Sequence, residues 1–513
     1  MGSKNSLTRV WSEHKELITL IAVIFMAVGT LSLVSLNVFK HNPDYDSYFL
    51  IETGRYIVTN HKLPETAYWL ITRDVPTIIQ QWLCCVVNYS FYSAGGFLGI
   101  KMLAYLMAAI LYGAFYILAR TCTKQKSFAM GIASALVCIC HQFLTTRPYA
   151  LTITLSVLLV VVLKRFFGTD KHTAKETILF YLAVAGIFII QANWQISNIV
   201  FPMLWICCFI PKLKDGKKPA LDLYAIGALV IGAVSTLINP NGIYGTLYLV
   251  KTLKDVGIFP IAEMDSPAMK SLSMVCVVAV IILTTVLIKK LPLWLIFASA
   301  GSVISACMYW RCLWMLMIPL AALVTMIEAK KAATAVKLLG AAAIIIIGFI
   351  KIPDAMVYYY VYPVEIKEDV ASYITGDDVV LFTDFNTGSY FTFSGFKVYY
   401  DARPDIYGPG IAGDKELNTE MSNVISGDID YGEFIDKYGF NWFAVNRVDN
   451  IDMYLQYTDG YEKVYDDGFL KIYKAVEVRL IGLSHHNPTQ LQNKCLQTVF
   501  ARANMRVMLN LIM

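Results

Sequence analysis

Long apolar runs dominate the first 351 residues of the chain, and short polar segments separate them. A helix needs about 20 apolar residues to cross the hydrocarbon core of a membrane. Eleven runs meet or approach this length, at 16–39, 97–119, 127–144, 149–166, 177–194, 195–210, 221–239, 272–288, 292–310, 311–328 and 334–351. The pattern predicts an α-helical polytopic membrane protein with about 11 transmembrane helices. A further stretch, 80–96, is typical of an interfacial or re-entrant helix before the second span.

Basic residues gather in every second loop between these runs, in segments such as "RTCTKQK", "KRFFGTDKHTAK" and "KLKDGKKPALD". Cytoplasmic loops of membrane proteins carry an excess of Lys and Arg. The bias therefore predicts a cytoplasmic N-terminus and places the loop 40–80 on the opposite side. Because the alternation holds through all the runs, everything after Lys351 is also expected to be extracytoplasmic.

Charged and turn-forming residues return after the last run, where short β-rich segments alternate with helical ones. The patterns predict strands at 378–384, 397–403 and 441–447, helices at 364–375 and 431–439, and a hairpin at 462–475 around Asp-Gly. We expect a transmembrane domain over 1–351, with the external loop 40–80, and a small extracytoplasmic α/β domain over 352–475. The basic tail 476–513 has no assigned role, and its composition is compatible with disorder.

The composition agrees with a protein that lies mostly in lipid. Of the 513 residues, 57% are hydrophobic and 16% are charged, whereas soluble domains usually carry about a quarter charged residues. We therefore expect a multi-pass protein of the cell membrane, with membrane lipid and no nucleic acid among its partners.

In the predicted topology, polar residues at the helix ends fall on the non-cytoplasmic side. They come from widely separated segments: Asp44, Asp46, Arg147, Asn193, Gln195, Glu263 and Arg311. Each has a simple structural explanation, because acids cap helices, arginines anchor at the membrane boundary, and amides satisfy freed backbone groups. Their coincidence on one rim nevertheless exceeds what loops need, and it predicts that acids and guanidinium groups meet in one pocket.

The middles of the apolar runs carry no Asp, Glu, Lys or Arg. Ion-coupled transporters usually place ionisable groups or broken helices at that depth. The pattern therefore argues against ion-coupled transport, whereas a lipid flippase needs no such residues.

A carboxylate beside arginines at a membrane boundary suits chemistry on a lipid-linked anionic substrate. An arginine can bind a phosphate with two parallel hydrogen bonds, and an aspartate can take the proton of an attacking hydroxyl. Sugar transfer from a polyprenyl-phosphate carrier needs both groups. A divalent metal, Mg²⁺ or Mn²⁺, held by Asp44 or Asp46 is compatible with this chemistry but is not required.

The stretches "DYDSYFLIETGRYIVTNHKLP" and "QQWLCCVVNYSFYSAGGFLGIKML" resemble the opening of a group of polytopic bacterial membrane proteins. The resemblance continues through "TTRPYALT", "ANWQIS", "INPNGIYG", "AEMDSP" and "FNTGSYFTFSGFKVYYDARPDIYG", over roughly 40–410. These proteins are similar in architecture to the GT-C superfamily of integral-membrane glycosyltransferases. The resemblance implies a polyprenyl-phosphate-linked donor and a catalytic acid in the first external loop, which is Asp44 here, with Asp46 as its companion. Gln195 stands where these relatives tend to have His, so no proton transfer is expected there.

The segment "YYDARPDIYG" is a second candidate, in the predicted α/β domain. An Asp–Arg pair that pins the loop is the simpler interpretation, with Asp401 or Asp405 beside Arg403. The alternative is acceptor recognition by Arg403 and Tyr407.

Two hypotheses of different classes follow. The first is a membrane glycosyltransferase that moves a sugar from a polyprenyl-phosphate donor to an envelope glycan, lipid or protein. In it, Asp44 is the favoured acceptor base, Asp46 a second base or metal ligand, and Arg147 and Arg311 bind the donor phosphate. Asn193, Gln195, Glu263 and Arg403 are the further substrate-binding candidates. The second is a non-catalytic glycan- or lipid-handling scaffold or flippase component, in which neutral replacements of both acids are tolerated.

Overall fold

The computed structural model describes residues 28–36, 38, 43–71, 75–214, 218–255, 272–326, 369–385, 387–408, 411, 415–446 and 449–476. These residues form two compact units. The first unit contains the described residues of 28–68, 75–326 and 402–411, and the second contains those of 69–71, 369–401 and 415–476. The division therefore differs from the predicted domains at two short segments, 69–71 and 402–411. The predicted tail lies outside the described residues, apart from Val476.

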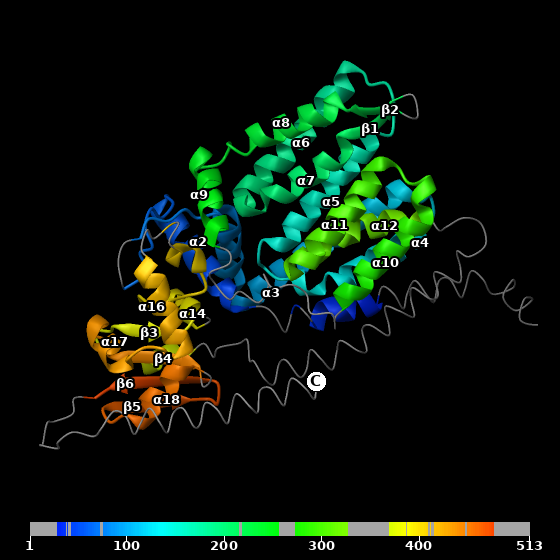
Figure 1. Ribbon diagram of the computed structural model, residues 1–513. Coiled ribbons are helices and arrows are strands. Elements are labelled where there is room, and N and C mark those ends of the chain that lie inside the picture. The colour runs from blue at the N-terminus through cyan, green and yellow to red at the C-terminus, as the bar shows by residue number, and fades with distance from the viewer. Residues whose placement is uncertain are drawn as a thin grey trace, which may run out of the picture. The chain divides into compact units, whose positions relative to one another are not determined.

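The first unit is a bundle of helices (Figure 1). Its helices are α2 (Tyr45–Asn60), α3 (Trp82–Cys122), α4 (Lys126–Ile139), α5 (Tyr149–Phe166), α6 (Ala174–Trp194), α7 (Val200–Phe209), α8 (Leu223–Ser235), α9 (Gly242–Asp255), α10 (Leu272–Leu287), α11 (Leu293–Met308) and α12 (Met317–Met326). One apolar core runs through the bundle, and Phe115, Phe188, Trp205 and Trp314 are its largest fully buried side chains.

Helix α5 lies in the middle of this bundle, and most of its residues are buried. Its 18 residues span about 27 Å, close to the roughly 30 Å of a bilayer's hydrocarbon core. Helix α6, by contrast, exposes Ile178, Leu179 and Leu182, as a lipid-facing helix does. The two ends of α5 therefore mark the two boundaries of the apolar layer: Tyr149 at one, and Lys164 and Arg165 at the other.

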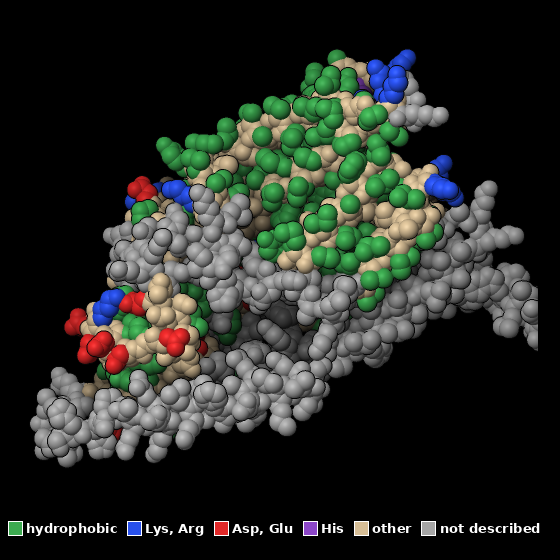
Figure 2. All heavy atoms as spheres, in the orientation of Figure 1, with side chains coloured by type: hydrophobic (Ala, Val, Ile, Leu, Met, Phe, Trp, Pro, Cys, Tyr) green, Lys and Arg blue, Asp and Glu red, His purple; other side chains and the backbone are tan. Residues whose placement is uncertain are grey.

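A short antiparallel ribbon follows α7 at the second of these boundaries. Strand β1 (Pro211–Lys214) pairs with β2 (Lys218–Leu221), a segment that the sequence predicted only as a basic loop. Figure 2 shows Lys and Arg side chains beside this ribbon, while apolar side chains cover the visible face of the helices.

The predicted number of 11 spans is not confirmed. Three helices are long and apolar enough to cross a membrane: α3, α5 and α6. Five further apolar stretches are shorter, at Lys126–Ile139, Ile196–Phe209, Leu223–Ser235, Leu293–Met308 and Arg311–Met326. Two predicted spans begin with a tight 3-10 turn, η2 (Ile196–Ile199) before α7 and η5 (Trp310–Leu316) before α12. The run 334–351 and most of 16–39 lie outside the described residues.

Helix α2 precedes the second predicted span, and helix α3 contains it. The predicted external loop contains α2, which was not expected to be helical. Helix α3 joins the predicted interfacial segment to the span, and its helical geometry breaks only at Gly95 and Gly96. Gly96 has a φ of 57°, which a residue without a β-carbon adopts at little cost. The break therefore falls where the sequence predicted a boundary.

The second unit is built around a four-stranded sheet with the order β3-β4-β6-β5. Its strands are β3 (Leu381–Thr383), β4 (Trp442–Asn446), β5 (Tyr461–Asp466) and β6 (Leu470–Ala475), and its helices are η6 (Val370–Tyr373), α14 (Gly388–Phe393), α16 (Lys415–Ser426), α17 (Tyr431–Tyr438) and α18 (Asn450–Tyr457). Strands β3 and β4 are parallel, and the other two pairs are antiparallel. Aromatic rings of Phe382, Tyr399 and Phe434 pack together in its core.

Several predicted elements of this region are confirmed: the strands within 378–384 and 441–447, the helix at 431–439 and the closing hairpin. The predicted strand 397–403 is wrong. Val398 alone forms isolated parallel bridges, with Leu70 and Leu381. The described residues 402–408 and 411 belong to the first unit, where η7 (Pro404–Tyr407) begins at a proline. Only part of the predicted helix 364–375 is described, and it forms the single 3-10 turn η6.

The close packing of α2 on α3 gives a test of this arrangement. A β-carbon at Gly54 would lie 2.1 Å from the carbonyl oxygen of Cys85, whereas one at Gly113 of α3 would meet nothing within 4 Å. We expect Gly54→Ala to lower the free energy of unfolding by about 1–3 kcal/mol or more, and Gly113→Ala to leave it unchanged or raise it. Thermal unfolding in detergent measures both, and equal stability of the two variants would contradict the packing.

Candidate functional site

The acid pair of the first loop lies at the start of α2. Asp44 is the N-cap residue of this helix, and its Oδ1 accepts hydrogen bonds from the Ser47 amide at 2.9 Å and the Ser47 hydroxyl at 2.7 Å. The Ser47 hydroxyl in turn accepts from the Asp44 amide at 3.1 Å. This reciprocal cap satisfies backbone groups that a helix start leaves unpaired. Asp46 lies in the first turn, where the helix dipole favours a negative charge.

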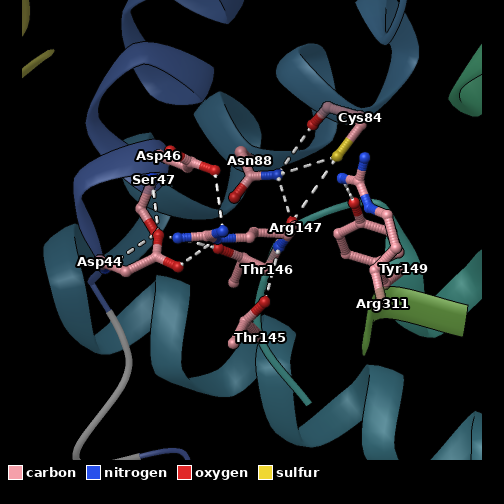
Figure 3. Close-up of polar contacts among 10 residues, drawn as sticks. All are labelled: Asp44, Asp46, Ser47, Cys84, Asn88, Thr145, Thr146, Arg147, Tyr149 and Arg311. Atoms are coloured by element: carbon pink, nitrogen blue, oxygen red, sulfur yellow. Dashed lines mark hydrogen bonds and ion pairs between the residues drawn. The ribbon is translucent and has the colours of Figure 1, made fainter. Parts of the chain in front are cut away.

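Arg147 binds both acids at once (Figure 3). Its Nε lies 2.6 Å from Oδ2 of Asp44, and its Nη1 lies 3.1 Å from Oδ2 of Asp46. Arg147 precedes α5 and is 103 residues from Asp44 along the chain. The side chain of Asp44 is 8% exposed, whereas those of Asp46 and Arg147 are 26% and 25% exposed. Asp46 is therefore the more accessible carboxylate.

The loop that carries Arg147 is held by residues that the sequence did not single out. Thr146 accepts from Asn88 Nδ2 at 3.2 Å through its carbonyl, and the Cys84 thiol donates to the same oxygen at 3.6 Å. The hydroxyl groups of Thr146 and Ser47 lie 3.2 Å apart. Asn88 is completely buried on α3, so helices α2 and α3 fix the backbone beside Arg147. Asn88 could have been found in the sequence, because it is a polar residue within an apolar segment, one helical turn after Cys84.

Arg311 approaches the same cluster from the other end of the chain. It belongs to η5, donates a hydrogen bond to the hydroxyl of Tyr149, and its guanidinium carbon lies 5.3 Å from the centre of the Tyr149 ring. It lies within electrostatic reach of both Arg147 and Asp46. Figure 3 shows Arg311 with Tyr149 at the edge of the group formed by Arg147 and the acids. The cluster thus contains two guanidinium groups and two carboxylates.

Asn193 and Gln195 form hydrogen bonds at helix ends. Asn193 accepts from the indole N–H of Trp82 at 3.1 Å and donates to the carbonyl of Ile238 at 2.8 Å. Gln195 accepts a side-chain hydrogen bond from Asn198. These contacts are the backbone and helix-end roles that the simpler interpretation expected. Glu263 lies outside the described residues.

Arg403 lies in the first unit and is 7% exposed. Its Nη1 donates to the Thr53 hydroxyl at 3.3 Å, and its guanidinium carbon lies 5.3 Å from the centre of the Phe49 ring. Asp405 accepts from Gln80 at 3.0 Å and from Tyr248 at 2.8 Å, and burial raises the pKa of its carboxyl. These contacts favour the interpretation in which the segment is pinned over the one in which Arg403 binds an acceptor.

The donor set around the acids fits a guanidinium better than a metal ion. Oδ1 of Asp44 is engaged by Ser47, and one Oδ2 from each acid faces Arg147. A positive charge already lies where a bridging cation would need to sit. In the described part of the chain, no group of three His, Cys, Asp or Glu side chains is placed to hold a metal.

Solved structures share this architecture. The archaeal oligosaccharyltransferase AglB from Archaeoglobus fulgidus, in complex with an inhibitory peptide and a dolichol-phosphate, superimposes with a TM-score of 0.52 at 12% identity, covering 91% of this chain and 75% of that one. ArnT from Cupriavidus metallidurans in the apo state gives a TM-score of 0.52 at 12% identity, covering 89% and 98%. Both are GT-C glycosyltransferases. This chain has the GT-C fold.

ArnT bound to undecaprenyl phosphate shows the same likeness, with a TM-score of 0.50 at 13% identity over 91% of this chain and 100% of that one. No protein-family model matches the sequence, and no curated protein matches it. The GT-C resemblance predicted from the first external loop is therefore confirmed at the level of fold.

The double role of Asp44, as helix cap and ion-pair partner, can be separated by two substitutions. Asn caps helices as well as Asp, so Asp44→Asn keeps the cap with Ser47 but removes the charge and the oxygen that accepts from Arg147. We expect it to lower the free energy of unfolding by about 1–3 kcal/mol. Asp44→Ala should cost about 1 kcal/mol more. Thermal unfolding in detergent compares the two, with the more exposed Asp46→Asn as the milder control. Equal stability of the Asn and Ala variants would contradict the capping role.

Proposed function

We propose that the protein is a membrane glycosyltransferase that transfers a sugar from a polyprenyl-phosphate-linked donor to a cell-envelope acceptor on the extracytoplasmic side. The observation that carries the proposal is the cluster of Asp44, Asp46, Arg147 and Arg311 at one end of α5, within a GT-C fold. Solved relatives of that fold contain dolichol-phosphate or undecaprenyl phosphate. The same class of lipid carrier fits the two guanidinium groups of this chain.

The proposed side of the membrane follows from the charges at the two ends of α5. The acid–arginine cluster adjoins its first residue, and Lys164 and Arg165 lie in its last turn, near the ribbon with Lys214 and Lys218. Because basic residues favour the cytoplasmic side, the cluster is assigned to the opposite side. There it would meet a lipid-linked donor and an envelope glycan, lipid or protein acceptor.

In the proposed reaction, the acceptor hydroxyl oxygen bonds to the anomeric carbon of the donor sugar. The bond from that carbon to the phosphate oxygen breaks, and its electron pair stays on the phosphate. Arg147 and Arg311 stabilise the phosphate as its charge grows, because a guanidinium offers several N–H donors in one plane. The hydroxyl proton passes to a carboxylate of the acid pair.

The contacts of the two acids suggest a division of their roles. We assign the base to Asp46, because it is the more exposed carboxylate and is not part of the helix cap. Asp44, which the resemblance favoured as the base, is held by Ser47 and Arg147 and would keep Arg147 oriented. Asn193 and Gln195 contribute through the helix ends that they hold, and Arg403 through its contacts with the middle of α2, rather than by touching the donor.

The test separates chemistry from binding. We expect Asp46→Asn to reduce sugar transfer by about 100-fold, so that the lipid-linked donor accumulates in cells of the native host, measured by mass spectrometry of extracted lipids. The purified variant should still bind undecaprenyl phosphate. Arg147→Lys should instead weaken that binding by about tenfold, because an ammonium group cannot make two parallel hydrogen bonds.

Arg120→Lys is the matched control, because Arg120 lies in the last turn of α3 and donates to the carbonyl of Thr123. It should leave both binding and transfer unchanged. Normal donor levels in the Asp46→Asn and Asp44→Asn variants would reject catalysis by the acid pair and favour the scaffold or flippase alternative. Undecaprenyl phosphate binding that is insensitive to Arg147→Lys would reject the phosphate site.

A further inference from the structure

A second group of interacting residues lies on the middle of α2, three to nine residues after its acid pair. Phe49, Glu52 and Thr53 have the spacing that places side chains on one face of a helix. Glu52 accepts a hydrogen bond of 2.6 Å from the hydroxyl of Tyr68, whose ring stacks on Tyr56 one turn further along. Phe49 and Thr53 contact Arg403. This face of α2 thus binds two segments that are distant from it in sequence.

The charges of this group are buried. Glu52 is 8% exposed and Arg403 is 7% exposed, and both lie within electrostatic reach of Tyr68. Burial, reinforced by the Glu52 carboxylate, raises the pKa of Tyr68, so the hydroxyl remains a hydrogen-bond donor at neutral pH. Buried charges contribute little net stability compared with apolar residues of the same size, but removing one partner is costly. We therefore explain the buried charges of Glu52 and Arg403 by the orientation that they give to α2 rather than by a gain in stability.

Arg403 is itself held in place by its neighbour two residues on. Asp405 accepts hydrogen bonds from Gln80, just before α3, and from Tyr248 of α9. The following residues Ile406 and Tyr407 are each 1% exposed. The segment 402–407 is therefore fixed to two parts of the first unit besides α2, and Arg403 contacts α2 from a firmly held position.

The rotation of α2 decides where its acids point. Successive residues of a helix are turned by about 100°, and the stretch from Thr53 back to Asp46 is about 10 Å long. A small rotation about the helix axis would carry Asp44 and Asp46 away from Arg147. Ser47 and Gly54 also pack closely, but neither carries a charge that selects one rotation.

We propose that Glu52 and Arg403 are positioning residues that fix the rotation of α2 and so hold Asp44 and Asp46 toward Arg147. Their importance for sugar transfer rests on the proposed function, but their effect on the acid pair does not. Residues 369–401 and 415–476, on either side of this segment, belong to the second unit. The C-terminal part of the chain therefore supplies a residue that orders the acid pair.

Hydrogen–deuterium exchange of the full-length protein in detergent tests the proposal. Arg403→Met keeps an unbranched apolar side chain but removes the guanidinium group, with its charge and its hydrogen bond to Thr53. We expect the amides of Ser47 and Tyr48, in the first turn of α2, to exchange about tenfold faster. Arg403→Lys keeps the charge and should give an intermediate rate, because a lysine cannot reproduce the planar contact with Phe49.

Lys471→Met is the matched control. Lys471 forms an ion pair of 2.6 Å with Asp452 in the second unit, with side-chain exposures of 12% and 4%. Its loss should accelerate exchange around α18 and β6 while leaving the first turn of α2 unchanged. Unchanged exchange at Ser47 in Arg403→Met, or equal acceleration there in Lys471→Met, would overturn the proposal.

Two further measurements test the positioning role if Arg403→Met does not fold and separate it from the proposed function. If Arg403→Met does not fold, Thr53→Val removes only the acceptor hydroxyl, and we expect about threefold faster exchange at Ser47; unchanged exchange would then overturn the proposal. Binding of undecaprenyl phosphate to the wild-type protein is measured in parallel. Failure of that binding counts against the proposed function, whereas the exchange result alone decides whether the contact of Arg403 with α2 positions the acids.

Discussion

The ion pairs between Arg147 and the two carboxylates of α2 are the interaction on which the site depends. Arg147 precedes the first residue of α5, where the positive end of the helix dipole disfavours a cation. Asp44 and Asp46 lie at the start of another helix, where the dipole favours anions. Bringing the two helix starts together lets the acids offset the unfavourable position of the arginine. The result is a concentrated set of charges at one end of an apolar helix bundle.

The same arrangement explains why the acids differ. Asp44 is committed to the helix cap and to Arg147, so it holds the geometry, whereas Asp46 has greater exposure and lies in the same first turn. A phosphate that binds Arg147 and Arg311 would face Asp46 most directly. Further along α2, Phe49 and Thr53 contact Arg403, and Thr53 lies 350 residues from it in sequence.

Much of the site could be predicted from the sequence because polar residues after apolar runs must lie at a membrane boundary. That reasoning identified Asp44, Asp46, Arg147 and Arg311, which the structure brings into one cluster. It also identified the hairpin 462–475, because the alternation of residues on both sides of Asp-Gly is a local signal. The resemblance of the first loop to GT-C proteins agrees with the fold.

Other features depend on contacts between distant segments, which local patterns do not encode. The support of Thr146 by Asn88 and Ser47 arises only when α2, α3 and the start of α5 meet. The segment 397–403 has the residues of a strand, but the chain leaves the second unit after Asp401 and no ladder forms. The 3-10 turns that begin two of the apolar runs were also not predicted, because hydropathy does not distinguish a 3-10 turn from an α-helix.

A cryo-electron microscopy structure of the protein in lipid nanodiscs with undecaprenyl phosphate would test the central claim most directly. The account predicts the phosphate within hydrogen-bond distance of the guanidinium groups of Arg147 and Arg311, with the carboxylate of Asp46 facing it. A phosphate bound at another part of the bundle, or an acid pair turned away from Arg147, would contradict it.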